Sequence, residues 1–127
     1  MITQYDPLGI FEQNPSKGGV LLPKPLNLAA AVANNQSLVA AVTGKKIYVL
    51  WLRIKTGNNV GNGVCVFKSA ANPLTTFISC PLDNQAAEFW PPVLGNYYLI
   101  TSTSEALLVD VTTQPVNIMG QYIEVMP

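Results

Sequence analysis

The feature that most constrains the fold of this chain is a series of short apolar segments, many with a two-residue period, separated by turn-forming residues. Alternation of apolar and polar side chains at every second residue is typical of strands that bury one face. The segments recur at roughly ten-residue intervals and are bounded by Gly, Pro and Asn, which favour turns. The expected strands cover residues 37–43, 46–54, 64–68, 76–80, 86–90, 97–101, 106–111 and 116–125.

About eight short strands without a convincing helix predict an all-β fold, an antiparallel two-sheet sandwich of jelly-roll or Greek-key type. The segment 46–54 is β-branched, aromatic and apolar on both faces, so we expect it to be a central strand between two layers. Gly120 interrupts the segment 116–125 and predicts a bulge or a close backbone approach.

The first 36 residues differ from the rest, because prolines and glycines interrupt them repeatedly. We therefore divide the chain into an extended N-terminal arm, residues 1–36, and a sandwich domain, residues 37–127. Fully extended, an arm of about 35 residues could reach on the order of 115 Å. It is too apolar for a free linker and is expected to lie on its own domain or on a neighbour. Within it, residues 27–34 could form a short helix or a strand.

The composition limits the chemistry available to the chain. There is no histidine, which excludes Ser-His-Asp and Cys-His nucleophile pairs, histidine metal sites and imidazole acid–base catalysis. The net charge is zero, so general nucleic-acid binding is disfavoured. The apolar runs are far shorter than the roughly 20 residues that span a membrane. We expect no cofactor, no metal, no nucleic acid, no membrane and no small-molecule substrate as partners.

The charges are unevenly distributed along the sequence. Only 11% of the residues are charged, against about 25% in average soluble domains. All seven basic residues lie in the first 68 positions with two acidic ones, whereas five acidic residues and no basic one follow. This asymmetry reflects chance or pairing within the molecule, or else a surface that docks basic edge to acidic edge between copies.

Individual motifs give no strong evidence of a catalytic site. The glycine-rich stretch 57–63 is followed by an expected strand, whereas a phosphate-binding loop needs a helix. The aromatic residues could stack on a sugar or a base, but packing is the favoured use; they are Trp51, Trp90, Tyr97 and Tyr98. Cys65 and Cys80 are expected to be free buried thiols, with a disulfide between neighbouring strands as the alternative.

Residues 39–50, Val-Ala-Ala-Val-Thr-Gly-Lys-Lys-Ile-Tyr-Val-Leu, resemble the opening strand pair of a group of small tailed-phage virion proteins. In that group, a Val-Ala-Ala-Val-x-Gly-Lys-Lys-Ile-x-Val-Leu segment leads into a sandwich. The resemblance continues in order through residues 66–69, 92–95, 104–107 and 120–125. The arm and the segment 90–92 depart from the group and leave open which part of a virion this is.

The resemblance implies a β-sandwich structural protein, commonly trimeric, that decorates a capsid or forms part of a tail or fibre. We expect a non-enzymatic decoration or cement protein on the virion surface, assembled in the host cytoplasm. As a homotrimer it would bind the outer capsid and staple neighbouring major capsid protein subunits through its arm. The expected arm contacts are Tyr5, Leu8, Ile10, Phe11, Val20, Leu21 and Leu22.

Two functions from other classes stay open. One is a tail-fibre or tail-tip receptor-binding head that recognises a host surface glycan through Trp90, Tyr97 and Tyr98. The other is a histidine-free hydrolase that uses a pair of carboxylates, for which Glu88 and Glu105 are the candidates.

Overall fold

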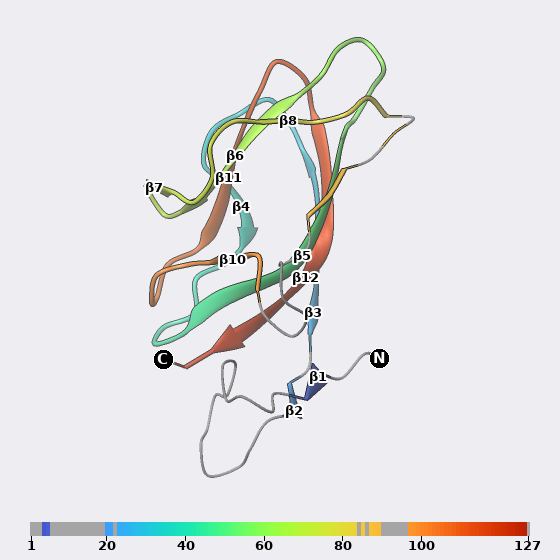
Figure 1. The fold of residues 1–127 in the computed structure, drawn as a ribbon. Coiled ribbons are helices and arrows are strands. Elements are labelled where there is room, and N and C mark those ends of the chain that lie inside the picture. The colour runs from blue at the N-terminus through green and yellow to red at the C-terminus, as the bar shows by residue number, and fades with distance from the viewer. Residues whose placement is uncertain are drawn as a thin grey trace.

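The computed structural model describes residues 4–5, 20–21, 23–83, 85, 87–89 and 97–126, with side chains described for 23–83, 85, 89 and 97–126. Two antiparallel sheets face one another and enclose the hydrophobic core, as Figure 1 shows. The described elements are all strands. The prediction of an all-β, two-sheet antiparallel sandwich is therefore confirmed.

The first sheet has its two longest strands at its centre, β5 (Lys46–Thr56) and β12 (Val116–Val125). They pair antiparallel from Val116 opposite Thr56 to Val125 opposite Lys46. Beyond β12 lies β3 (Lys24–Ala30), and beyond β5 lie β10 (Leu99–Ile100) and β9 (Ala87–Phe89). The prediction that β5 is a central strand is confirmed, but the second sheet covers only one of its faces, so among the described elements it does not lie between two layers.

The second sheet is built around β11 (Leu107–Thr112) and β6 (Val64–Ser69). Strand β4 (Gln36–Val39) flanks β11, whereas β7 (Asn72–Pro73) and β8 (Ile78–Ser79) both pair with β6. Figure 1 shows β4, β6 and β11 across from β3, β5 and β12. Neighbouring strands in each sheet are mostly distant in sequence, because many connections run from one sheet to the other.

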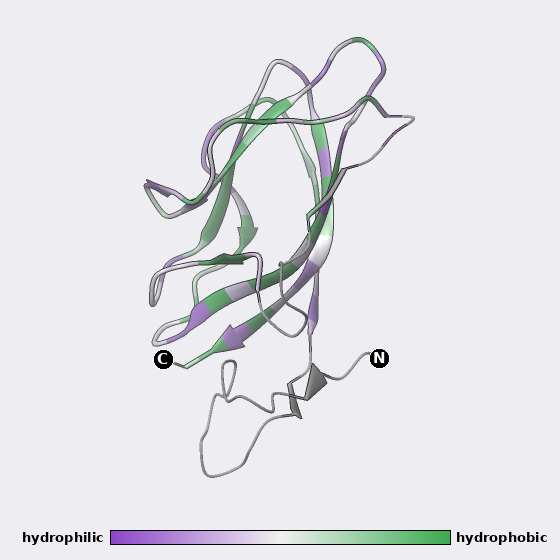
Figure 2. Ribbon diagram, viewed as in Figure 1, coloured by the Kyte–Doolittle hydropathy of each residue, from purple (hydrophilic) through white to green (hydrophobic). Residues whose placement is uncertain are grey.

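The core lies between the sheets and is filled by every second residue of the long strands. Burial alternates along β6 and along β11, and Phe67, Leu107 and Val109 are completely buried. The other sheet contributes Leu52 and Ile118. Figure 2 shows the same alternation of hydrophobic and hydrophilic residues along the ribbon of β12. This period of two results from the pleat of a strand with one buried face.

A bulge in β5 explains much of its apolar character on both faces. Val49 pairs with Tyr122 and Trp51 pairs with Gln121, so Leu50 is an extra residue between them. The residues that face the core therefore change from odd to even positions, with Val49 before the bulge and Leu52 after it.

At the bulge, the opposite face of the first sheet carries a second, smaller hydrophobic cluster. Leu50 packs with Ile123 and Val125 in this cluster, and the partly buried Tyr48, Trp51 and Tyr97 pack against them. Ile123 lies on this face, whereas the preceding residue, Tyr122, packs against the main core on the other face. Residues 46–54 are thus apolar on both faces for two reasons. The bulge changes which positions face the core, and the two faces contribute to two separate hydrophobic clusters.

Gly120 allows β12 to lie unusually close to β5. A Cβ atom at this position would overlap the carbonyl oxygen of Trp51 and would lie 3.2 Å from a methyl group of Leu52. The close approach predicted from the sequence is confirmed, and the bulge lies one step away in the partner strand.

The boundary between arm and sandwich lies earlier than residue 36. Strand β3 pairs with β12 along its whole length, and its Leu26 and Ala30 are buried in the core. The sandwich therefore begins at Lys24, and the strand alternative for residues 27–34 is correct as far as Ala30. The prolines misled the prediction because an edge strand tolerates a residue without an N–H group, such as Pro25.

The arm is described only where it pairs with itself. β1 (Gln4–Tyr5) runs antiparallel to β2 (Val20–Leu21), with hydrogen bonds to neither large sheet. Residues 4–5 therefore lie beside residues 20–21. Of the expected arm contacts, Leu8, Ile10, Phe11 and Leu22 lie outside the described residues, and only the backbone of Tyr5, Val20 and Leu21 is described.

Replacement of Gly120 tests the close approach of β12 to β5. Gly120→Ala should lower the free energy of unfolding by about 2–3 kcal/mol, because the added methyl group overlaps the Trp51 carbonyl. Gly61→Ala is the control, since the nearest atom to its added carbon lies 3.9 Å away. It should change the stability by less than about 0.5 kcal/mol. Denaturant titration followed by tryptophan fluorescence measures both, and equal stabilities would contradict the close approach.

Candidate functional site

The most prominent candidate surface is the outward side of β3, β12 and β5, which we call the outer face. Its central row places Met119 between Asn27 of β3 and Arg53 of β5. Rows on either side are centred on Asn117 and Gln121. The outer face consists of Pro25, Asn27, Ala29, Trp51, Arg53, Lys55, Asn117, Met119 and Gln121.

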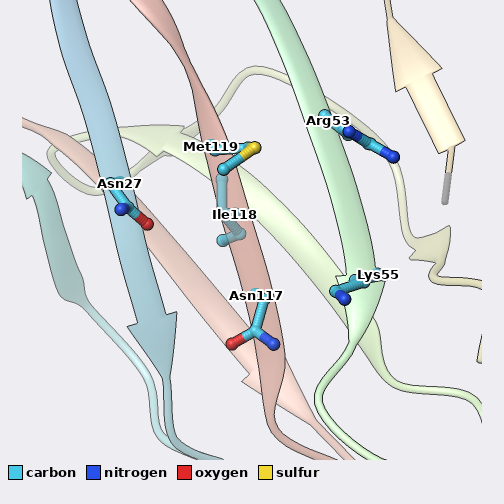
Figure 3. Close-up of a pocket in the computed structure, with 6 residues that line it drawn as sticks. All are labelled: Asn27, Arg53, Lys55, Asn117, Ile118 and Met119. Atoms are coloured by element: carbon cyan, nitrogen blue, oxygen red, sulfur yellow. The ribbon is translucent and has the colours of Figure 1, made fainter. Parts of the chain in front are cut away.

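The outer face contains a shallow hollow of about 190 Å³ over these three strands. Its lining is shown in Figure 3 and comprises Asn27, Arg53, Lys55, Asn117, Ile118 and Met119. Met119 is 43% exposed. At one side of the face, Trp51 Nε1 donates a hydrogen bond of 3.0 Å to Gln121 Oε1, which fixes the orientation of the indole ring.

The outer face has the residue types of a protein-binding surface. It combines a tryptophan, a methionine and an arginine with amide side chains, and none of its nine residues is acidic, although Asp83 pairs with Lys55 at 3.1 Å and Glu88 of β9 lies opposite Arg53 at its border. Trp, Met and Arg are enriched in protein interfaces, whereas Asp and Glu are depleted. Amide side chains both donate and accept hydrogen bonds, so they can pair with exposed backbone or with side chains of a partner.

Ion pairs within the molecule account for much of the uneven charge distribution. Each pair joins a base from the first 68 residues to an acid that follows them. They are Lys24–Glu124 at 3.0 Å, Lys45–Glu124 at 3.8 Å, Lys55–Asp83 at 3.1 Å and Lys68–Asp110 at 3.2 Å. The hydrogen bond to Glu124 raises the pKa of Lys24 above its ordinary value. The intramolecular explanation of the asymmetry is therefore confirmed for these groups.

Tyr97 and Tyr98 contact other rings of the protein. Tyr97 lies edge-on to Tyr48 with ring centroids 4.7 Å apart, and Tyr98 stacks on Phe89 at 5.5 Å. Tyr98 also packs against the core, and its burial raises the pKa of its phenol. Packing, the use favoured from the sequence, is thus found for both tyrosines. Trp90 lies outside the described residues, so glycan binding by this set stays a prediction.

The other candidate groups from the sequence are the carboxylates and the glycine-rich loop, and hydrogen bonds within the protein hold those that the structure describes. Glu105 accepts a hydrogen bond of 2.6 Å from Ser69 Oγ, and Asp110 accepts one of 2.7 Å from the backbone of Asn35. Only the backbone of Glu88 is described. Loop 57–63 is closed at its base, where the hydroxyl of the buried Thr56, the last residue of β5, accepts a hydrogen bond from the Gly63 amide at 2.7 Å. The loop leads directly into β6, as expected.

The described part of the chain contains neither a candidate metal centre nor a candidate membrane-spanning helix. No cluster of three or more His, Cys, Asp or Glu side chains there could hold a metal ion. Nor does any helix among the described residues have the length and apolarity needed to cross a membrane.

Comparisons with known protein families, with curated protein sequences and with solved structures found no match to this chain. The resemblance to phage virion proteins therefore stays an expectation from the sequence.

Sequence reasoning singled out Trp51 but missed the rest of the outer face. One available signal was the alternation of Asn117, Met119 and Gln121 with buried residues in the last strand. The contribution of β3 could not be found from it, because residues 24–30 had been assigned to the arm.

Substitution of two consecutive residues tests which side of β12 is open to solvent. Met119→Ser should change the free energy of unfolding by less than about 0.5 kcal/mol, because the side chain is exposed. Ile118→Ala should lower it by about 2–5 kcal/mol, because Ile118 is 1% exposed. Thermal and denaturant unfolding of the isolated protein measure both. A large loss in Met119→Ser would mean that the outer face is covered.

Proposed function

We propose that this chain is a non-enzymatic structural protein of a tailed-phage particle. In this proposal it is a decoration or cement protein that binds the outer capsid surface as an oligomer. Its N-terminal arm staples neighbouring subunits of the major capsid protein. The proposal is supported by the sequence resemblance over about residues 38–125, by the sandwich fold and by the low charge of the chain.

The observation that carries the proposal is the outer face and its position next to the arm. The arm enters the sandwich at Lys24, the first residue of β3, and β3 forms one side of the outer face. The junction of the arm with β3 therefore lies at the border of the outer face, and we propose that the arm and the outer face contact the same partner. A stable protein contact needs on the order of 1,000 Å² or more of buried surface, which two adjoining elements can supply together.

The use of the described carboxylates also supports a binding role. Asp83, Asp110 and Glu124 are in ion pairs, and Glu105 accepts a hydrogen bond from a serine hydroxyl. Acid–base catalysis needs carboxylates that are placed to exchange protons with a substrate. These four are instead engaged in holding strands and loops together.

The copy number of the protein in purified phage particles tests the function directly. Quantitative mass spectrometry against the major capsid protein should give a simple ratio to it, because a decoration protein occupies equivalent sites over the whole capsid. Only a few copies per particle would instead point to a tail or fibre part. Absence from the particle would overturn the virion proposal.

Two variants separate the contribution of the arm from that of the outer face. Deletion of residues 1–22 should abolish binding to particles that lack the protein, while the sandwich stays folded because it begins at Lys24. Met119→Asp should weaken binding at least about tenfold, because it places a charge at the centre of the contact. Co-sedimentation with particles measures the binding.

The control for Met119→Asp is Phe77→Asp, an equally drastic change of an exposed residue beside the second sheet. Phe77→Asp should bind particles like the unaltered protein. Undiminished binding by the deletion variant would exclude the arm as a staple, and equal binding by both aspartate variants would exclude the outer face. A longer deletion, to residue 35, is unsuitable because it removes β3 and so leaves β12 paired on one side only, with β5.

A further inference from the structure

The two cysteines form a buried pair at one side of the core. Cys65 lies in β6 and Cys80 follows directly after β8, and both are free thiols without solvent exposure. Their Sγ atoms are 3.6 Å apart. This is van der Waals contact between two sulfurs that are separated by 15 positions in sequence.

The backbone on both sides holds the thiols in this position. Cys65 is opposite Ile78 in the pairing of β6 with β8. The Cys80 amide donates to the Gly63 carbonyl at 2.8 Å, so the two cysteines are diagonal neighbours on the same face. The Cys80 carbonyl accepts hydrogen bonds from Thr56 Oγ1 at 3.1 Å and Asn62 Nδ2 at 2.8 Å. Thus Cys80 is fixed beside Cys65 although β8 is only two residues long.

We propose that Cys65 and Cys80 are a reversible redox pair that closes into an intramolecular disulfide when the folded protein meets a small disulfide oxidant. The sulfurs need to approach by roughly 1.5 Å to reach the S–S bond length of about 2.05 Å. The oxidant class is a low-molecular-weight disulfide such as glutathione disulfide. This site is independent of the proposed virion function.

The reaction takes place in two balanced exchange steps. The Cys80 thiolate attacks one sulfur of glutathione disulfide, forms a mixed disulfide and releases a glutathione thiolate. The Cys65 thiolate then attacks Cys80 Sγ, forms the Cys65–Cys80 bond and releases the second glutathione thiolate. The protein loses two protons and two electrons, and the electrons reduce the glutathione disulfide to two thiols.

The contact between the thiols favours this order of events. Their hydrogen bond raises the pKa of Cys65 and lowers that of Cys80, because a Cys80 thiolate accepts a hydrogen bond from the Cys65 thiol. Burial opposes ionisation at both sulfurs. Cys80 directly follows the two-residue strand β8, so the oxidant reaches its sulfur first when this short strand opens, and the first attack comes from Cys80. Slow oxidation is the expected behaviour, because both thiols are buried.

A disulfide at this position would fasten an edge of the second sheet. The loop between the cysteines contains β7, β8 and Phe77, which is 78% exposed. β7 and β8 are each two residues long and both pair with β6. Closing the loop covalently restricts the unfolded chain and so stabilises the folded one.

Equilibration of the full-length folded protein with glutathione buffers of increasing oxidised fraction tests the proposal. Samples are quenched in acid, alkylated in denaturant and weighed by mass spectrometry. The expected result is loss of both alkylation sites together, with a mass lower by two hydrogens and no glutathione attached. Dithiothreitol should restore both sites. The oxidised form should melt at a higher temperature and exchange its Cys80 amide hydrogen more slowly.

Cys65→Ser and Cys80→Ser are matched controls, because neither can form the internal bond and neither should gain stability on oxidation. If either variant fails to fold, the titration of the unaltered protein is sufficient. Two thiols that stay alkylatable at every glutathione ratio would overturn the proposal. Stable glutathione adducts or disulfide-linked dimers in place of the internal bond would also overturn it.

Discussion

The pairing of β5 with β12 is the interaction on which the rest of the structure depends. Gly120 lets the two strands approach closely, and the extra residue Leu50 shifts the phase of β5 beside it. The pairing therefore decides which side chains enter the core and which form the outer face. Strands β3, β9 and β10 are then added at the two sides of this pair. A different register would exchange buried and exposed residues along the whole sheet.

Several charged side chains are paired with one another within the molecule, whereas the outer face consists mainly of uncharged residues. Bases and acids from the two parts of the sequence meet in ion pairs around the sandwich, so much of the charge is neutralised within the molecule. The outer face carries amides, a methionine, a tryptophan, Arg53 and Lys55, and Lys55 forms an ion pair with Asp83. Such a surface is easily desolvated, because amides lose less hydration on contact than charges do.

The sequence predicted the long strands well and the edges less well. Residues 116–125 were placed correctly because apolar residues alternate with polar ones over most of the ten residues, although the buried positions change from even to odd after Gln121. The segment 76–80 contracts to Ile78–Ser79, and 24–30 was missed because its prolines indicated irregular chain. The bulge at Leu50 left no mark in the sequence, because residues 47–52 are all apolar. The outer face joins strands from distant parts of the sequence, so no local pattern could reveal it.

The order of strands along the chain has a consequence for biosynthesis. β12 lies between β3 and β5 in the sheet, yet it follows every other described strand in sequence. During translation, β3 and β5 therefore wait without their common neighbour until residues 116–125 have been made. Folding of the first sheet is completed only after synthesis of β12, and long-range pairing of this kind is slow. A nascent chain that stops before residue 116 lacks the strand that unites the sheet, and so it cannot form the sandwich.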